Sequence, residues 1–363
     1  MSSDLEGRID VRLRQQAGRV TGVDIRSTRP QLARKLMAGR TPEEAADLAG
    51  LVFSLCGQAQ RAAAQAACRA ALGEANETAD ATPVLMELVR EHAWRLLLDW
   101  PQEVGQAPDM ASLLALRQAP PEHFASTLEN LLRDQLLGEA PAVWLARDLA
   151  GLEAWIKQGA TLPARLFAQL FATLGEGPDA GISQAQLLPE LSAWNNEMAT
   201  ALAHRTLDDP AFCNLPDWRG APAETGAIAR THRHPLLAEW IARRGRGMGA
   251  RLLARLHELA DLPYQMQVGG THTLKAWSIG EGESECVGIA GVETSRGLLF
   301  HVASLRDGKV ADYRILAPTD WNFHPVGPLA QALMGLDASK EQARLVSRSL
   351  DPCVAFGVEI VNA

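Results

Sequence analysis

Alanine and arginine place the strongest constraint on this chain, because both residues favour α-helix and both recur along most of its length. The sequence contains 59 alanines and 30 arginines but only five lysines. Hydrophobic residues make up 47% of the 363 residues and charged residues 21%, a composition that supports a sizeable core and excludes a disordered chain. We therefore predict a helix-dominated protein of one large or two smaller domains.

The net charge and the lack of recognisable targeting segments limit the binding partners and the cellular location that we expect for the protein. The formal net charge is −8 at pH 7, which argues against a general binder of nucleic acid or of anionic membranes. The first residues show no basic region followed by an apolar one, and no window of about 18 apolar residues occurs later. These features predict a soluble, cytoplasmic protein with no nucleic-acid partner and no membrane insertion.

Two regions near the ends of the chain depart from the helical pattern. Residues 8–25 alternate between apolar and polar side chains on both sides of Gln15-Gln16-Ala17-Gly18, which predicts a β-hairpin. Gly291–Ser304 and Val310–Leu316 are strand-like and flank an Asp-Gly turn, which predicts a second hairpin. The fold class is therefore α+β and helix-dominated, with the two ends of the chain packed together. The predicted sub-regions are 1–73, a helical region at 83–260, and 285–363.

A helix start and a glycine define the segment around the first cysteine. Thr41, Pro42 and Glu44 provide an N-cap, a proline at the first helical position and a capping glutamate. The apolar run that follows extends towards Leu72 and contains Gly57 in its middle. Glycine inside a helix costs about 1 kcal/mol relative to alanine, so Gly57 either breaks the helix or allows another segment to approach closely.

The five cysteines form neither of the common cysteine frameworks. Their number is odd, and no two of them are spaced as a CxxC pair, which argues against both a disulfide scaffold and a classical zinc site. Taken alone, they are best interpreted as small buried hydrophobic residues. The sequence at 245–250 fits GxGxxA, but a helical segment precedes it where a dinucleotide-binding site needs a strand.

Several segments, in order along the chain, resemble the large subunit of nickel–iron hydrogenases. The resemblance implies that fold for 1–363 as a single domain, with a shortened helical core. The segments that carry it are Leu5-Glu6-Gly7-Arg8, Leu36–Arg40 with Pro42, Cys56-Gly57-Gln58-Ala59, Pro222–Arg230, Glu293–Gly297, Pro318–Asn322 and Asp351-Pro352-Cys353.

The departures from the hydrogenase pattern are as informative as the matches. Each of the family's two CxxC motifs keeps its first cysteine, Cys56 and Cys353, while the positions of the metal-bridging cysteines hold Ala59 and Phe356. Neither alanine nor phenylalanine has a lone pair to offer a metal. We therefore expect no catalytic nickel–iron centre, no bound nickel and no enzymatic turnover.

The pattern is similar to that of the HupK and HoxV accessory proteins of hydrogenase maturation. The resemblance implies a scaffold or carrier for the Fe(CN)2CO fragment, bound transiently by Cys56 and Cys353 before its transfer to the apo large subunit. Arg296 would hydrogen-bond the cyanide nitrogens, and Glu6 and Glu224 are further candidate cofactor-binding residues. The implied partners are the HypC–HypD complex or a HypC-like chaperone, and the hydrogenase large subunit.

Two other interpretations of the same resemblance stay open at this point. The chain could be a metal-free mimic of the large subunit that recruits maturation factors, or a minimal hydrogenase that turns over. For the site residues, the corresponding alternatives are relic thiols packed in a core for Cys56 and Cys353, a structural ion pair for Arg296, and packing or buried polar roles for Glu6 and Glu224.

Overall fold

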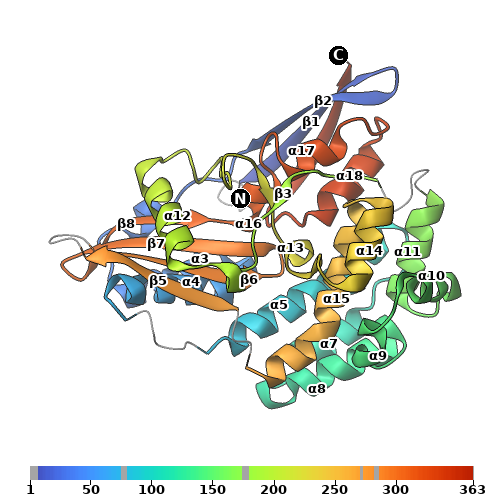
Figure 1. The fold of residues 1–363 in the computed structure, drawn as a ribbon, viewed down its shortest axis with the longest axis horizontal. Coiled ribbons are helices and arrows are strands. Elements are labelled where there is room, and N and C mark those ends of the chain that lie inside the picture. The colour runs from blue at the N-terminus through green and yellow to red at the C-terminus, as the bar shows by residue number, and fades with distance from the viewer. Residues whose placement is uncertain (1–6, 75–79, 174–179, 270–272, 282–285, 363) are drawn as a thin grey trace.

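A computed structural model describes residues 7–74, 80–173, 180–269, 273–281 and 286–362, which fold into helices around two main β-sheets (Figure 1). Among these residues, no helix combines the length and the apolar character that crossing a bilayer requires. The four-stranded sheet and its covering helices occupy one side of the molecule, and a bundle of helices occupies the other (Figure 1).

The larger sheet is antiparallel and lies between two layers of helix. Its strands run in the order β5 (Leu274–Glu281), β6 (Cys286–Thr294), β7 (Gly297–Arg306) and β8 (Lys309–Leu316). Helices α3 and α4 cover one face, and α12 covers the other (Figure 1). These helices span Pro42–Val52, Gly57–Ala71 and Asn196–Asp208.

Alanines bring α4 unusually close to this sheet. The helix buries Ala59, Ala63, Ala64 and Ala67 against β6 and β7. Gly288 on β6 completes the fit, because a Cβ atom there would lie 2.1 Å from the carbonyl oxygen of Ala67. The alanine-rich composition therefore serves close helix–sheet packing as well as helix formation.

The smaller sheet joins the two ends of the chain, as the sequence predicted. Strand β1 (Arg8–Gln16) pairs antiparallel with β2 (Arg19–Ser27) and parallel with β9 (Ala355–Asn362). Ile9 lies opposite Phe356 in the parallel ladder. Figure 1 shows the first hairpin lying beside the last strand. Helices α17 (Pro328–Leu333) and α18 (Lys340–Ser349) contribute to the hydrophobic core beneath this sheet.

The helical bundle surrounds α15 (Met248–Gln267), which is the longest described helix and is buried along most of its length. Two short segments of wider helical turn, Arg95–Asp99 and Leu132–Leu137, interrupt the bundle helices. The other helices of this region are α5 (Thr82–Trp94), α6 (Trp100–Glu103), α7 (Met110–Gln118), α8 (Pro121–Leu131), α9 (Pro141–Leu145), α10 (Leu149–Gln158), α11 (Leu162–Thr173), α13 (Ala227–Thr231) and α14 (Pro235–Arg244).

The remaining elements are short. They are α2 (Ala33–Met37), the 3-10 turns Ser54–Cys56 and Leu191–Ala193, the paired strands β3 (Gln186–Leu187) and β4 (Ala223–Glu224), and α16 (Pro318–Asn322).

The predictions around Thr41 and Gly57 are confirmed. Thr41 and Glu44 form a reciprocal capping box at the start of α3. The apolar run breaks at Cys56, and Gly57 also allows a close approach, because a Cβ atom there would lie 2.8 Å from the carbonyl oxygen of Gly50. Both consequences of the glycine therefore occur together.

The prediction of one strand over Gly291–Ser304 is wrong. The structure divides this stretch into β6 and β7, joined by a turn at Ser295-Arg296, and β5 and β9 were not predicted. Both faces of β6 and β7 are buried, so their sequences run apolar without the alternation that marks a half-exposed strand. The turn also lacks the Asn-Gly or Asp-Gly pair that marks a tight hairpin.

Candidate functional site

Cys56 lies at the end of the 3-10 turn that leads into α4. The first backbone N–H groups of this helix, from Gln58 and Ala59, donate to the carboxylate of Glu87 at 2.8 and 3.0 Å, which fixes the helix start. Burial raises the pKa of the Cys56 thiol to about 11, and the nearby positive charge of Arg296 opposes that rise. Cys56 is therefore a neutral thiol near pH 7, and binding of a metal would favour its thiolate form.

An uncharged chain of buried side chains lies behind Cys56. The amide nitrogen of Gln60, one helical turn later, is 3.5 Å from the Cys56 sulfur. The Gln60 amide oxygen is 2.9 Å from Nε2 of His301 on β7, whose Nδ1 lies 2.7 Å from the Tyr313 hydroxyl on β8. Burial lowers the pKa of His301 to about 3, so the imidazole is neutral. The chain thus orients the Gln60 amide towards the sulfur without any net charge.

Cys353 lies in the short connection between α18 and β9. The hydroxyl of Thr319, on α16, donates to the Cys353 sulfur at 3.1 Å and accepts the Cys353 backbone N–H at 3.4 Å. Two residues earlier, Asp351 adopts a left-handed backbone conformation with φ of 55°. Its carboxylate is buried among the side chains of Arg95 at 2.7 Å and Arg255 at 3.1 Å. The segment before the cysteine is therefore anchored by ion pairs.

Arg296 projects from the turn between β6 and β7 towards both cysteines. The Thr294 hydroxyl oxygen accepts the backbone N–H groups of Arg296 and Gly297 and so holds this turn. The guanidinium contacts Glu91 at 2.7 Å and Asp351 at 3.7 Å. Burial alone would lower the pKa of Arg296, but Asp351, Glu91 and the two thiols outweigh it and raise the pKa above its ordinary value. These four groups therefore converge on one cation.

Arg296 also keeps unused hydrogen-bonding capacity. Its side chain is 4% exposed, yet Nη1 has no hydrogen-bond partner within the described residues. A buried guanidinium N–H without a partner costs free energy unless an acceptor arrives. A second cation, Arg29, reaches the same cluster of thiols and pairs with Asp320 at 2.6 Å. The site is therefore suited to an anionic group held beside two sulfur atoms.

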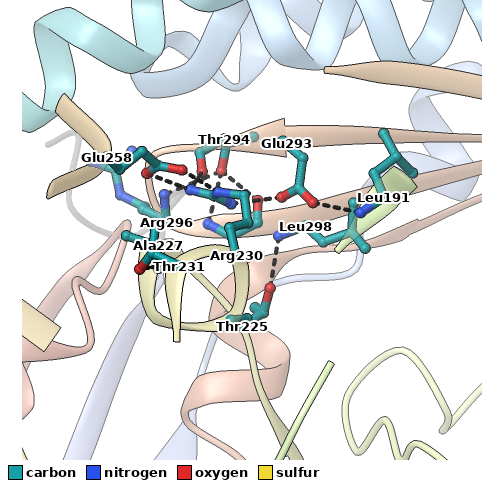
Figure 2. Close-up of polar contacts among 12 residues, drawn as sticks. Leu191, Thr225, Ala227, Arg230, Thr231, Glu258, Glu293, Thr294, Arg296 and Leu298 are labelled. Atoms are coloured by element: carbon teal, nitrogen blue, oxygen red, sulfur yellow. Dashed lines mark hydrogen bonds and ion pairs between the residues drawn. The ribbon is translucent and has the colours of Figure 1, made fainter. Parts of the chain in front are cut away.

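The turn that carries Arg296 is fixed by segments from three parts of the sequence. Thr225 accepts the Leu298 backbone N–H at 2.9 Å, as Figure 2 shows, and Asn322 bonds both the N–H and the carbonyl of Thr225. Gly297, at φ of 135°, has no room for a side chain, because a Cβ atom would lie 2.5 Å from the Thr225 methyl group. The segments 222–230, 293–297 and 318–322, which carry the family resemblance, therefore pack as one unit.

A buried ionic network extends from Asp351 into the helical bundle. Arg255 bridges Asp351 to Nδ1 of His92, whose Nε2 lies 2.7 Å from Glu258. Arg230 then pairs with Glu258 and, at 2.6 Å, with Glu293 (Figure 2). Burial would raise the pKa of Glu258, but Arg230 outweighs it and holds that pKa well below its usual range. The network ties the cysteine segment to the core of the molecule.

The other predicted site residues occupy different places. Glu6 lies outside the described residues. Glu224 is buried, and its two carboxylate oxygens pair with Arg251 at 2.6 and 3.2 Å. It faces a cavity of about 20 Å³ that Arg296 also lines, so it lies behind Arg296 rather than beside the cysteines. Ala59 is buried in the α4 packing, and the ring of Phe356 lies beneath Arg348, so neither position provides a metal donor.

Cys353 and Arg296 open onto a cleft of about 690 Å³. Its walls come from the turn before α4, from α5, from α7 and from the C-terminal segment. Within the described part of the chain, no group of three or more His, Cys, Asp or Glu side chains could hold a metal ion. The site therefore offers two thiols and a buried arginine rather than a complete ligand set.

Sequence reasoning missed several residues of this site. Gln60 follows Cys56 by four residues, a spacing that places the two side chains on one helix face, so helical geometry could have identified it. Asp351 lies inside a recognised segment, yet its pairing with Arg95 depends on a tertiary contact. Nothing in the sequence marked Thr319, His301 and Tyr313 as neighbours of the cysteines.

This chain is similar in sequence to a known protein family and to several known proteins. The profile of the nickel-dependent hydrogenase family matches residues 237–359. The hydrogenase expression/formation protein HoxV of Cupriavidus necator is 33% identical over 97% of this chain and 96% of its own length. The corresponding protein HupK of Rhizobium leguminosarum bv. viciae is 30% identical over 94% of this chain and 93% of its own.

A solved structure confirms the predicted fold. The [NiFeSe]-hydrogenase of Dm. baculatum superimposes with a TM-score of 0.58 over 96% of both chains at 16% sequence identity. This likeness shows that the helical bundle and the two sheets follow the hydrogenase large-subunit architecture.

Proposed function

The chain belongs to the HupK and HoxV family of hydrogenase expression/formation proteins, and on that premise we propose that it carries the Fe(CN)2CO fragment for a nickel–iron hydrogenase. Cys56 and Cys353 would bind the iron as thiolates, and the loaded fragment would then pass to the apo large subunit. In this proposal the fragment is cargo, so the site must bind it and also release it.

The observation that carries the proposal is the convergence of two thiols on one buried arginine. Cys56 and Cys353 are 297 positions apart in sequence, yet both act on the charge of Arg296. Two thiolates suit a soft metal such as low-spin iron, whose cyanide and carbonyl ligands fill most of its remaining positions. The N–H groups of Arg296 that lack partners within the described residues would then donate to the cyanide nitrogens.

The site also supports a carrier rather than an enzyme. The positions that would bridge a second metal hold Ala59, packed in the alanine core, and Phe356, on β9. The diatomic ligands and two thiolates leave the coordination of the iron incomplete, which keeps the fragment exchangeable and favours its release to an acceptor. We therefore propose no hydrogen turnover and no resident nickel, and we propose the HypC–HypD complex or a HypC-like chaperone as the donor.

Infrared spectroscopy of the anaerobically purified protein tests this function. Produced in a host with a full set of maturation proteins, the protein should show cyanide and carbonyl stretching bands. Cys56→Ala and Cys353→Ala should each remove most of the band intensity, because one thiolate does not retain the fragment. The matched control is Cys213→Ala, which alters a buried thiol of a separate core cluster and should leave the bands unchanged.

Other outcomes would assign a different role. Absent bands in the wild-type protein, together with binding of maturation proteins, would favour the metal-free mimic of the large subunit. Robust hydrogen uptake by the nickel-replete protein would instead establish a minimal hydrogenase and exclude the carrier.

A further inference from the structure

The cleft above Cys353 is larger than its proposed cargo. The iron fragment has seven non-hydrogen atoms, whereas the cleft encloses about 690 Å³, within the range of pockets that hold much larger ligands. Leu55 and Gln58 form one wall, and Glu87, Arg90 and Trp94 on α5 form another. Space therefore remains for side chains of a second molecule while the cargo lies on the cysteines.

The cleft is positively charged although the whole protein is acidic. Five arginines and two glutamates line it. Three of these arginines are neutralised from within, since Arg95 pairs with Asp351, Arg296 with Glu91, and Arg348 with Glu103. The remaining two, Arg90 and Arg117, have no ion pair in the part of the chain that the structure describes. Their charge is available to an outside group.

Arg90 and Arg117 are held close together in spite of their like charges. The Arg90 guanidinium lies 5.0 Å from the centre of the Phe124 ring, and that of Arg117 lies 5.9 Å from the Trp94 ring. A terminal nitrogen of Arg90 lies 3.5 Å from the backbone carbonyl of Arg117. Burial lowers the pKa of Arg90, and the charge of Arg117 lowers it further, whereas Glu87 opposes both. A further anion beside the pair would favour the charged form of Arg90 in the same way as Glu87.

The acidic groups nearest to this pair are already engaged. Both carboxylate oxygens of Glu87 accept backbone N–H groups at the start of α4, and Glu91 pairs with Arg296. On the opposite wall Leu55 is 52% exposed, and Leu51 and Val52 are exposed in the preceding helix, outside the cleft lining. A segment that combines a carboxylate with apolar side chains would complement both walls.

We propose that Arg90 and Arg117 dock an acidic segment of the donor protein that delivers the iron fragment to this chain, while Leu55 and Trp94 contact the apolar residues beside that acid. This inference rests on the proposed function and adds a docking surface to the site. Each guanidinium presents a planar fork of N–H donors, which matches the geometry of a carboxylate. Docking there would place the partner in the cleft onto which Cys353 opens.

Binding of a purified, iron-free HypC-like chaperone to the full-length protein tests the docking surface. The double variant Arg90→Glu/Arg117→Glu should bind at least about tenfold more weakly at low salt, and the difference should shrink towards 1 M salt because exposed charges are screened there. Arg219→Glu is the matched control, because Arg219 also lies over a tryptophan ring but does not line the cleft. It should bind like the wild type.

A second variant tests the chemistry of the contact. Arg117→Lys keeps the charge but loses the planar fork, so it should bind more weakly than the wild type and more tightly than the double variant. Its amine should couple to an aspartate or glutamate of the chaperone under a zero-length carbodiimide cross-linker, and mass spectrometry should identify that residue. Unchanged affinity in the double variant, a cross-link confined to other surfaces, or no measurable binding by the wild-type protein would each overturn the docking surface.

The two proposals fail in different ways. Cys56→Ala and Cys353→Ala should lose the infrared bands but bind the iron-free chaperone normally. Infrared bands that depend on both cysteines, combined with unchanged chaperone affinity in the arginine variants, would keep the carrier and remove the docking surface. Weakened chaperone binding in the arginine variants of a protein that never shows the bands would keep the docking surface and remove the carrier.

Discussion

The two cysteines of the site are held by different kinds of interaction. Cys56 precedes a long alanine-rich helix and is backed by the uncharged chain of Gln60, His301 and Tyr313. Cys353 follows Asp351, which is buried among three arginines. Apart from the Glu87 carboxylate at the start of α4, Cys56 is therefore backed by packing and neutral hydrogen bonds. The segment before Cys353 is anchored by buried charge, although Thr319 bonds Cys353 itself.

This difference has consequences for how each cysteine responds to change. Buried charges are costly when one partner is removed, because the remaining charge stays desolvated. Neutral hydrogen bonds lose less and are insensitive to salt. The Cys353 segment should therefore be firmly tied in the native state yet vulnerable to a single neutralisation, whereas Cys56 should tolerate the loss of one member of its chain.

The largest effect should come from Asp351→Asn. Asparagine has nearly the same size as aspartate and also tolerates the left-handed backbone conformation at this position. The substitution therefore isolates the loss of charge. It leaves Arg95, Arg255 and Arg296 without their shared counterion, which should lower the free energy of unfolding by about 3–5 kcal/mol. Urea denaturation measures the loss, and alkylation of Cys353 should accelerate more than that of Cys56.

Asp337→Asn provides the control for this prediction. Asp337 pairs with Arg19 on the surface, where both side chains are more than half exposed. Its neutralisation should cost about 1 kcal/mol or less. If Asp351→Asn cost no more than this control, the Cys353 segment would be held by packing, and the contrast between the two cysteines would disappear.

Acidification should weaken the two halves over different pH ranges. Burial would raise the pKa of Asp351, but Arg95, Arg296 and Arg255 outweigh it and hold the pKa well below its usual range. Its folded pKa thus lies below the unfolded value of about 4, so its stabilisation is complete above that value and is lost as pH falls towards the folded pKa. This loss belongs to the Cys353 half.

During acidification, the Cys56 half should begin to lose stability at a higher pH than the Cys353 half. Burial lowers the pKa of His301 to about 3, against about 6.5 in the unfolded chain. Between these values the unfolded state binds a proton that the folded state does not, so stability falls as pH drops below about 6.5. His92, in the network of the Cys353 half, has its pKa lowered to about 4 by burial and adds to the decline over the same range, so the variants below are needed to separate the two histidines. Urea denaturation from pH 8 to 3 should show both ranges.

Two variants separate these contributions through the slope of the free energy of unfolding against pH, rather than through its absolute value. His301→Gln should flatten part of the decline between pH 6.5 and 4, and Asp351→Asn should flatten only the part at lower pH. If Asp351→Asn altered the slope near pH 6 instead, the assignment of the two ranges to the two halves would be wrong.

The sequence predicted the parts of this arrangement that depend on local signals. The first hairpin, the capping box at Thr41 and the break at Gly57 follow from alternation, cap chemistry and glycine, and each occurs in the structure. The union of the two chain ends also occurs, through the parallel pairing of β1 with β9. The turn at Arg296 was not predicted, because strands buried on both faces carry no periodic signal.

Which residues surround the site depends on tertiary contacts, and local sequence patterns do not encode these contacts. Cys56, Cys353 and Arg296 were selected by their likeness to family motifs, and the structure brings them together. The partners that hold them come from distant elements, as with Gln60 and His301, which are 241 residues apart. Glu224 was selected by the same likeness, but in the structure it forms a buried ion pair with Arg251 behind the site.

The smallest effect should come from the far end of the neutral chain. Tyr313→Phe removes the hydroxyl that lies 2.7 Å from Nδ1 of His301 and leaves that buried nitrogen without its partner. The free energy of unfolding should fall by about 1–3 kcal/mol, less than for Asp351→Asn. Because the folded His301 is neutral, the difference from wild type in urea should be the same throughout the range of about pH 5 to 8. Tyr264→Phe, at a tyrosine that is 61% exposed, should change nothing. A Tyr313→Phe penalty that varied with pH in that range would mean that His301 takes up a proton in the folded protein, and Cys56 would then be held by electrostatics as Cys353 is.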